Sequence, residues 1–468
     1  MRKLLSYILL ALVFGLVACN PVEEETEPTS ENPGGRKPAF DNGEEAGPIR
    51  LGFNLEETGD AATFGNSARQ GAEIAIDELN AAGGILGRNI ETVFDDNQSM
   101  SGPAANVASK LINQDQVDVL IGALTSTNSI AMAKIANEAG VPMVTPTSTK
   151  TDLTVTEDGE VFKYVFRTCF TDDFQGEGIV NFAVKGPIQA EKAVVLYDAE
   201  NDYSVGIYET IKRVAPEMGL EIVAENSYLK SSEADFRSKL NMFKAHEFDV
   251  LIVPGFYNQV GMIANQAREV GLDQPLLGGD GFDSPELYKV AGNNIVGSYF
   301  TNHYSADDMD PAVQSYIRKF KEQYGGKVPD AFSILAYDTV MMVADAIERA
   351  GGTDPEALCD ALAATSGFKG AAGAITIDEK HNATKKLVVL EIAEGGETHW
   401  VYTYDPLGEM SATADADARD DDAGEADTDE AHEGDADGEE GEAEHAEEDA
   451  EGEEHGEVDG HDEDGEGH

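Results

Sequence analysis

Short apolar stretches alternate with segments of helical length, and this alternation limits the folds that the chain can adopt. The first series predicts strands at Ile49–Phe53, Ile90–Phe94, Val117–Gly122 and Pro142–Thr145. Helices are expected between them, at Gly65–Ala82, Ala104–Asn113 and Asn128–Ala139. Parallel strands joined by helices form a sheet that is covered on both faces. The first series therefore indicates an α/β lobe with a doubly wound parallel sheet.

The same alternation starts again after residue 192. Strands are predicted at Ala193–Tyr197, Glu221–Ala224 and Asp249–Val253, and helices at Ser204–Met218, Ala234–Lys244 and Asn258–Val270. The C-terminal half adds helices at Pro311–Tyr324 and Asp330–Ala350 and strands at Leu387–Ile392 and Trp400–Tyr404. Two such series indicate two α/β lobes, and the chain is long enough for both.

The N-terminus carries the pattern of a secretory signal. Arg2 and Lys3 precede an apolar run from Leu4 to Val17, which is shorter than the ~20 residues that cross a bilayer. Residues 16–19, Leu-Val-Ala-Cys, resemble a bacterial lipobox, which implies cleavage before Cys19 and acylation of that residue. The alternative is an ordinary signal peptide with a chance cysteine. We expect a body tethered by lipid on the outer side of the cytoplasmic membrane.

Acidic residues give the chain a formal net charge of −58, and they are concentrated near its ends. Residues 20–48 are expected to be a flexible acidic spacer. Residues 411–468 contain 28 acidic residues and one arginine, and 409–468 are expected to be a disordered acidic tail with histidines. Those histidines lack metal-ligand spacing, so no metal site is assigned. Nucleic acid is excluded as a partner because little positive charge is available to neutralise phosphates.

Catalytic motifs are missing from the sequence. The segment 59–65 lacks the ending of a phosphate-binding loop, and no nucleophile elbow of the Gly-x-Ser-x-Gly type occurs. We therefore expect no catalytic residues, no cofactor and no enzyme activity. Cys169 and Cys359 are either a disulfide pair or, as we favour, two separate buried thiols.

Hydroxyl-bearing loops follow two successive strands of the first series. One is the loop 123–129, which leads into a helix and contains Ser126, and the other is 145–149, with Thr147 and Thr149. Hydroxyls beside the free N–H groups at a helix start suit a carboxylate. Either loop alone could simply cap a helix. In parallel sheets, ligands bind where such loops gather, at the C-terminal ends of the strands.

The second series offers carboxylates instead. Asp280 lies between glycines after a short apolar strand, and Asp172 falls where the chain leaves the first lobe. Either could bind a ligand ammonium through charge-assisted hydrogen bonds, although an aspartate in a glycine-rich turn can also be purely structural. Three aromatic residues at loop positions, Phe64, Tyr203 and Phe256, could form walls of a pocket or belong to the core.

Residues 49–405 resemble the branched-chain amino-acid binding proteins of bacterial ABC importers, which have the type I periplasmic-binding fold. The most specific match is residues 71–87, GAEIAIDELNAAGGILG. Further matches are residues 95–97, 122–129, 145–147, 198–203, 266–272 and 278–281. The resemblance implies two lobes joined by three crossovers, near Cys169–Thr171, Tyr299–Asn302 and Gly370–Gly373. Lobe 1 would comprise residues 49–170 and 302–370, and lobe 2 residues 171–301 and 371–408.

The resemblance also implies roles for individual residues. Ser126 and Thr149 would hold the α-carboxylate of an amino acid, and the main chain at Thr147 would accept from its ammonium. Asp280 would bind the ammonium, with Asp172 and Tyr203 closing from the second lobe. Phe64 and Phe256 would lie near the ligand side chain.

Three departures from the family are visible in the sequence. Gln98 and Thr125 occupy positions that form a disulfide in some relatives, so that bond is missing. Asp280 stands where the family commonly has Glu and is one methylene shorter, and Phe256 stands in place of a Tyr.

The resemblance implies a monomeric solute receptor that captures a branched-chain or otherwise apolar amino acid and delivers it to an importer permease. The alternative is a ligand-sensing module for an amide, a urea-type compound or another small polar solute.

Overall fold

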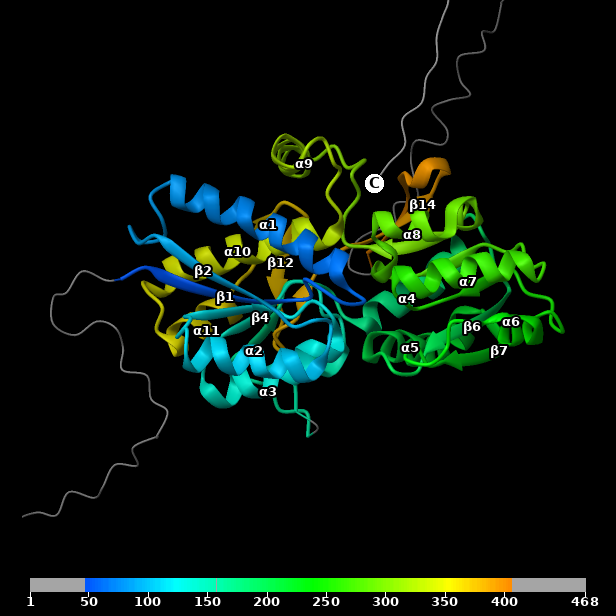
Figure 1. The fold of residues 1–468 in the computed structure, drawn as a ribbon, viewed down its shortest axis with the longest axis horizontal. Coiled ribbons are helices and arrows are strands. Elements are labelled where there is room, and N and C mark those ends of the chain that lie inside the picture. The colour runs from blue at the N-terminus through cyan, green and yellow to red at the C-terminus, as the bar shows by residue number, and fades with distance from the viewer. Residues whose placement is uncertain (1–46, 157, 406–468) are drawn as a thin grey trace, which may run out of the picture. The chain divides into compact units, whose positions relative to one another are not determined.

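Five parallel strands form the sheet of the first lobe in a computed structural model that describes residues 47–156 and 158–405 (Figure 1). The predicted signal, spacer and tail lie outside the described residues. The strand order is β2 (Ile90–Asp96), β1 (Ile49–Leu55), β3 (Val119–Gly122), β4 (Met143–Thr145) and β5 (Val165–Arg167). The four strands predicted in the first series are present, and β5 is an additional edge strand.

Helices cover both faces of this sheet (Figure 1). One face carries α1 (Ala62–Ala81), α10 (Ala331–Ala350) and α11 (Pro355–Ala363), and the other carries α2 (Ser101–Asn113) and α3 (Ser126–Ala139). The short α9 (Pro311–Gln323) packs on α1. Helices α1 and α10 approach closely because Gly71 has no side chain: a Cβ there would lie 1.9 Å from the carbonyl oxygen of Ser333.

Seven strands form the sheet of the second lobe. Their order is β15 (Thr398–Tyr404), β14 (Leu387–Ile392), β10 (Tyr299–Asn302), β9 (Leu276–Gly278), β8 (Val250–Ile252), β6 (Lys192–Asp198) and β7 (Glu221–Tyr228). Strand β14 runs antiparallel to both β10 and β15, and the remaining pairs are parallel. The fold class is therefore α/β, with two mainly parallel sheets, as predicted.

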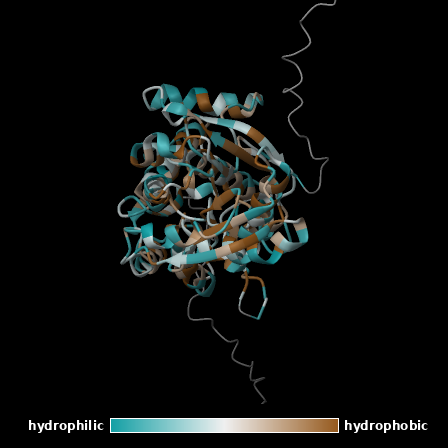
Figure 2. Ribbon diagram, turned by 90° about the vertical axis from the view of Figure 1, so that its right-hand side faces the viewer, coloured by the Kyte–Doolittle hydropathy of each residue, from teal (hydrophilic) through white to brown (hydrophobic). Residues whose placement is uncertain are grey.

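Alternate residues of the central strands face the two helical layers of the second lobe. Val195 packs in the cluster beneath α4 (Asp172–Lys185) and α5 (Asp202–Met218). Val194 and Leu196 pack in the other cluster, which includes residues of α6 (Arg237–Phe243), α7 (Tyr257–Glu269) and α8 (Pro285–Ala291). Figure 2 shows the most hydrophobic colour on strands and alternating colour along the outer helices, as expected for helices with one buried face.

Three crossings connect the sheets, following β5, β10 and β13. The first two lie at the predicted crossovers or directly beside them, since residues 168–171 follow β5 and His303 follows β10. The third differs from the expectation. Gly370 and Gly373 face each other in a hairpin of the small sheet β11 (Phe368–Gly370), β12 (Gly373–Ile377) and β13 (Ala383–Thr384).

The Gly370–Gly373 turn stays with the first lobe because Asp338 of α10 holds it there. The Asp338 carboxylate accepts hydrogen bonds from the backbone N–H groups of Ala371 (2.5 Å) and Ala372 (2.8 Å). The chain passes to the second sheet only at residues 385–386, between β13 and β14.

Helix α4 was not indicated by the sequence pattern. It contains Gly176 and Gly178, which have low helix propensity, and it is buried on most sides. Both glycines are explained by close packing, since a Cβ would lie 2.7 Å from Thr210 and 2.8 Å from Leu387. The pattern was hidden because tertiary contacts, rather than one apolar stripe, stabilise this helix.

Two further features of the described residues bear on the predictions. Cys169 and Cys359 are buried free thiols, as we favoured. Within residues 47–156 and 158–405, every helix is too short or too polar to cross a membrane.

Two aspartates come together where the lobes meet. Asp283 accepts hydrogen bonds from Asn302 Nδ2 (2.9 Å) and from the N–H of Ala331 (2.7 Å), and Asp330 caps the same helix α10. Burial raises the pKa of both carboxyls; the charge of Asp280 raises that of Asp283 further, and the charge of Asp283 raises that of Asp330. The pKa of Asp330 rises to about 7, well above its ordinary value.

Because the folded state raises the pKa of Asp330, its contribution to stability is largest at low pH and is lost as pH rises through about 7. Asn is also a good helix cap, so Asp330→Asn keeps the cap without the titration. We compare the wild type with Asp330→Asn by the difference between their free energies of unfolding. This difference should favour the wild type by about 1–2 kcal/mol more at pH 5.5 than at pH 8. Urea unfolding at both pH values measures this difference. A difference that does not change with pH would contradict the assignment.

Candidate functional site

A small cavity lies between the lobes, where the C-terminal ends of β1, β3, β4 and β9 approach one another. It has about 250 Å³ of empty space. Residues of both lobes line it, namely Phe64, Leu124, Thr125, Ser126, Thr147, Thr149 and Phe332 from the first and Tyr203, Phe256, Asp280 and Gly281 from the second. The structure thus brings together all of the predicted site residues except Asp172.

The start of α3 forms one wall, and the buried carboxylate of Glu56 holds it in place. Glu56 accepts hydrogen bonds from the N–H groups of Leu124 and Thr125 (3.1 Å each), the Thr125 hydroxyl (2.8 Å) and Asn128 Nδ2 (2.8 Å). Burial raises the pKa of Glu56, and these hydrogen bonds oppose the rise. The next N–H groups, in the first turn of α3 from Ser126, have no partner within the helix and can bind an anion.

The neighbouring loop, residues 145–150, is positioned by a buried arginine. Arg167 at the end of β5 donates to the carbonyl oxygens of Ser148 (2.9 Å) and Lys150 (2.6 Å). The N–H of Lys150 donates to Ser126 Oγ at 3.3 Å, so this loop and the α3 start are joined. The buried Thr149 hydroxyl lines the cavity and lies beside the Asp172 carboxylate, whose pKa it lowers by hydrogen bonding.

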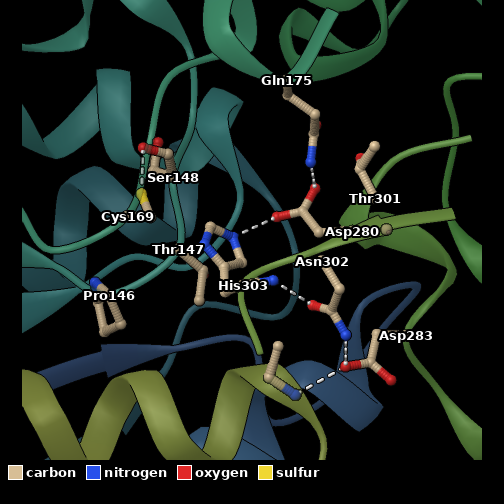
Figure 3. Close-up of polar contacts among 12 residues, drawn as sticks. Pro146, Thr147, Ser148, Cys169, Gln175, Asp280, Asp283, Thr301, Asn302 and His303 are labelled. Carbon is tan, nitrogen blue, oxygen red and sulfur yellow. Dashed lines mark hydrogen bonds and ion pairs between the residues drawn. The ribbon is translucent and has the colours of Figure 1, made fainter. Parts of the chain in front are cut away.

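Asp280 forms the opposite wall. It begins the short 3-10 helix η2 (Asp280–Phe282), directly after β9, and is 4% exposed. Its carboxylate accepts from Gln175 Nε2 (2.9 Å) and from His303 Nε2 (3.1 Å), as Figure 3 shows. The flanking glycines are needed for close approach, because a Cβ on Gly279 would lie 2.3 Å from the Tyr203 hydroxyl. The glycine-rich turn therefore lets Tyr203 pack closely beside the Asp280 carboxylate.

Tyr203 and Asp172 differ in where they lie relative to the Asp280 carboxylate and the cavity. The Tyr203 hydroxyl accepts from the N–H of Gly281 (3.0 Å), and burial followed by the nearby Asp280 carboxylate raises its pKa well above the usual range. Asp172 does not line the cavity. Its N–H donates to the Thr149 carbonyl (2.6 Å), and its carboxylate lies against Gly206 of α5. Burial raises the pKa of Asp172 well above its usual range, and the charge of Asp280 raises it further.

Aromatic rings close the remaining side of the cavity. Phe64 stacks on Phe332 with centroids 3.8 Å apart, and its edge contacts Phe256 at 5.5 Å. Phe256 in turn stacks on Tyr203 at 5.4 Å. This side of the cavity suits an apolar group.

Direct contacts across the cleft show that the lobes are closed on each other. The Thr127 hydroxyl donates to Asp202 Oδ2 at 2.8 Å, joining the starts of α3 and α5. The Asp60 carbonyl accepts from the Tyr257 hydroxyl (3.0 Å) and from Asn258 Nδ2 (3.3 Å). These contacts connect the first lobe to both helical layers of the second.

A larger groove, with about 1570 Å³ of empty space, lies between α1, α8 and the segment before α10. Its buried carboxylates, Asp283 and Asp330, already accept hydrogen bonds from backbone and side-chain donors of the protein. We therefore place the ligand in the smaller cavity, where polar groups remain unpartnered.

Metal and catalytic chemistry have few candidates in the structure. No group of three or more His, Cys, Asp or Glu side chains suited to a metal ion occurs within residues 47–156 and 158–405. Among the described residues that line the cavity, Asp280 is the single charged side chain.

Five contributors to the site were missed by sequence reasoning: Glu56, Arg167, Gln175, His303 and Phe332. None lies in a polar loop that follows a predicted strand and precedes a helix, apart from Glu56 just after β1. Their contacts are all with residues far away in sequence. The one signal in the sequence that pointed to four of them was a polar side chain among apolar neighbours, and Phe332 had none.

Comparisons with known proteins agree with this geometry. The sequence family described as periplasmic binding protein matches residues 48–397. The Leu/Ile/Val-binding protein homolog 3 of Brucella melitensis is 29% identical over 333 residues, covering 71% of this chain and 87% of that protein. The solved structure of the branched-chain amino acid transporter substrate-binding protein LivJ from Streptococcus pneumoniae, in complex with isoleucine, is 34% identical with a TM-score of 0.70. It covers 75% of this chain and 98% of that one.

A more distant structure shares the fold. It is an ABC transporter solute-binding protein from R. palustris in complex with benzoate, with 23% identity and a TM-score of 0.68, covering 76% of this chain and 96% of that one.

Proposed function

The chain belongs to the periplasmic binding protein family, and on that premise we propose that it captures an aliphatic amino acid between its lobes and delivers it to the permease of an ABC importer. The observation that carries this proposal is the polarity of the cavity. A helix start with hydroxyl side chains beside it forms one wall, and a single carboxylate, Asp280, forms the other.

A zwitterion matches both walls at once. Ser126, Thr149 and the first N–H groups of α3 would bind the α-carboxylate, as helix starts bind anions. The carboxylate of Asp280 and the main-chain carbonyl at Thr147 would accept from the ammonium, with the Tyr203 hydroxyl beside them. Asp172 would act indirectly, because it stands behind Thr149. A ligand without an ammonium would leave the buried Asp280 carboxylate without a counter-charge.

The aromatic side of the cavity favours an apolar side chain. Phe64, Phe256 and Phe332 present ring surfaces and no charged group. Burying a branched aliphatic group against them stabilises the complex through the hydrophobic effect, by about 1.5–3 kcal/mol for a Val or Leu side chain.

Ligand binding and lobe closure would be coupled. Since one wall belongs to each lobe, a bound amino acid stabilises the arrangement in which Thr127 meets Asp202 and Asp60 meets Tyr257. The permease would recognise this closed surface. We expect the receptor to act as a monomer, since both walls come from one chain.

A thermal-shift screen tests the proposed function. Protein refolded from urea, and so freed of bound solute, is heated with aliphatic amino acids, simple amides, urea and benzoate. A ligand at 100 times its Kd adds about 2.7 kcal/mol of stability. Stabilisation by leucine, isoleucine or valine is expected. Stabilisation by amides or urea alone would favour the ligand-sensing alternative. Stabilisation by benzoate alone would favour a receptor for carboxylates.

We also propose that the protein works outside the cytoplasmic membrane, anchored by lipid on Cys19. The lipobox-like residues 16–19 support this, and they lie outside the described residues. Cys19→Ser should move the protein from the membrane fraction to the soluble extracytoplasmic fraction and abolish labelling by palmitate. Cys359→Ser, which alters a buried thiol, is the matched control and should leave both unchanged. Retention of label in Cys19→Ser would contradict the anchor.

A further inference from the structure

His303 lies on the second crossing between the lobes and contacts the carboxylate that faces the ligand cavity (Figure 3). We infer that His303 is a positioning residue for ligand recognition: its Nε2–H fixes the Asp280 carboxylate in the orientation that binds the ligand's ammonium. This inference rests on the proposed function, because it assumes that Asp280 binds an ammonium.

The geometry ties Asp280 from two sides. His303 Nε2 lies 3.1 Å from Oδ2, and Gln175 Nε2 of α4 lies 2.9 Å from Oδ1. Each carboxylate oxygen can accept more than one hydrogen bond, so both remain able to accept from a ligand. Without His303, the carboxylate would lose this donor to Oδ2 and would be held by Gln175 on Oδ1 and by the neighbouring Tyr203 hydroxyl.

The surroundings of the ring determine which nitrogen carries the proton. His303 Nδ1 is buried and has no hydrogen-bond partner among the described residues, whereas Nε2 faces a carboxylate oxygen. A neutral imidazole therefore places its single proton on Nε2. Burial lowers the pKa of His303, which favours the neutral form, although the Asp280 carboxylate opposes this. Neutral His303 orients Asp280 and leaves its negative charge for the ligand.

The imidazole itself is held rigidly. Its side chain is 1% exposed, and the ring stacks on Phe170 of the first crossing with centroids 3.8 Å apart and planes 17° apart. The backbone next to it is also fixed, because the N–H of His303 donates to Asn302 Oδ1 and Asn302 Nδ2 donates to Asp283. Asp283 in turn accepts from the start of α10, in the first lobe.

These contacts form one hydrogen-bonded path from α10, across the second crossing, to the ligand cavity (Figure 3). His303 therefore contacts Asp280 of the second lobe directly and is linked, through Asn302 and Asp283, to the start of α10 in the first lobe.

The test compares variants of His303 by calorimetric titration with L-leucine. His303→Gln carries an amide nitrogen that can reach Asp280 as Nε2 does, whereas the shorter His303→Asn cannot. His303→Phe keeps a ring for stacking on Phe170 and removes the donor. Hydrogen bonds to charged groups are strong, so we expect His303→Phe and His303→Asn to weaken leucine binding roughly 10- to 100-fold. His303→Gln should keep most of the affinity of the unsubstituted protein.

Two further measurements separate positioning from a general structural effect. In an Asp280→Ala background, His303→Asn should cause no additional loss, because the group that it acts through is gone. His381→Phe is the matched control: His381 also stacks on a phenylalanine, Phe166, at 4.0 Å and also uses a ring nitrogen, yet it lies away from the cavity. It should leave leucine affinity unchanged.

The possible results are distinct. Equal leucine affinity in the Gln and Asn variants, or losses that add to that of Asp280→Ala, would overturn the role of His303 while leaving the proposed function intact. If the unsubstituted protein binds no amino acid at all, the proposed function fails and the inference fails with it. Because Asn and Gln are both polar and smaller than or similar to histidine, the comparison holds even if the Phe variant does not fold.

Discussion

Replacing Asp280 by alanine should weaken amino-acid binding by about 2–5 kcal/mol, the range found when one partner of a buried charge pair is removed. Asp280 is 4% exposed and is the single charged side chain among the described residues that line the cavity. Its loss leaves the ligand ammonium buried without a counter-charge, and no other carboxylate lines the cavity to replace it. Asp172 lies behind Thr149 and is raised in pKa by burial, so it is a poor substitute.

Calorimetry with L-leucine measures this effect. Asp173→Ala is a suitable control, because Asp173 lies on α4 close to the site but pairs with Arg213 and Thr210 at the surface of the second lobe. The control should bind leucine as the unsubstituted protein does. An Asp280→Ala affinity within about 1 kcal/mol of the unsubstituted protein would remove Asp280 from the site.

Replacing Glu56 by alanine should lower the free energy of unfolding by about 3–5 kcal/mol, because it removes a buried carboxylate and leaves its buried donors unpaired. Two backbone N–H groups, the Thr125 hydroxyl and the Asn128 amide would lose their common acceptor. Ligand affinity should fall as well, since the same contacts place the start of α3, where Ser126 would bind the α-carboxylate.

Urea unfolding and leucine titration of the same Glu56→Ala preparation measure both effects. Glu73→Ala provides the comparison, because half-buried Glu73 forms an i,i+4 pair with Arg69 and a long hydrogen bond (3.3 Å) with the Tyr324 hydroxyl, contacts that contribute little. A loss of stability no greater than that of Glu73→Ala would show that Glu56 does not hold the loop.

The sequence predicted those features that depend on local pattern. Alternating strands and helices identified both lobes, because a parallel sheet requires a crossover helix between successive strands. The rule that ligands bind beyond the C-terminal ends of strands placed Ser126, Thr149 and Asp280 near a common cavity before any contact was known. Asp172 was expected beside the ligand but does not line the cavity, since its position at the start of α4 could not reveal which way its side chain points.

The remaining features depend on tertiary contacts that leave no periodic signal. Arg167 and Glu56 are charged residues beside buried strands, and only the fold shows that their hydrogen-bond partners are loop N–H and carbonyl groups. The family resemblance implied a lobe crossing near Gly370–Gly373. Asp338, far away in sequence, decides that this turn remains with the first lobe.

The central claim is that the cavity recognises both charged ends of an amino acid at once. Titration calorimetry of refolded protein with L-leucine, 4-methylpentanoate and 3-methylbutylamine tests it directly, because each analogue lacks one charged group. Leucine should bind, and each analogue should bind more weakly by at least about 2 kcal/mol. Equal binding of 4-methylpentanoate and leucine would contradict the role of Asp280, and equal binding of 3-methylbutylamine would contradict that of the α3 start.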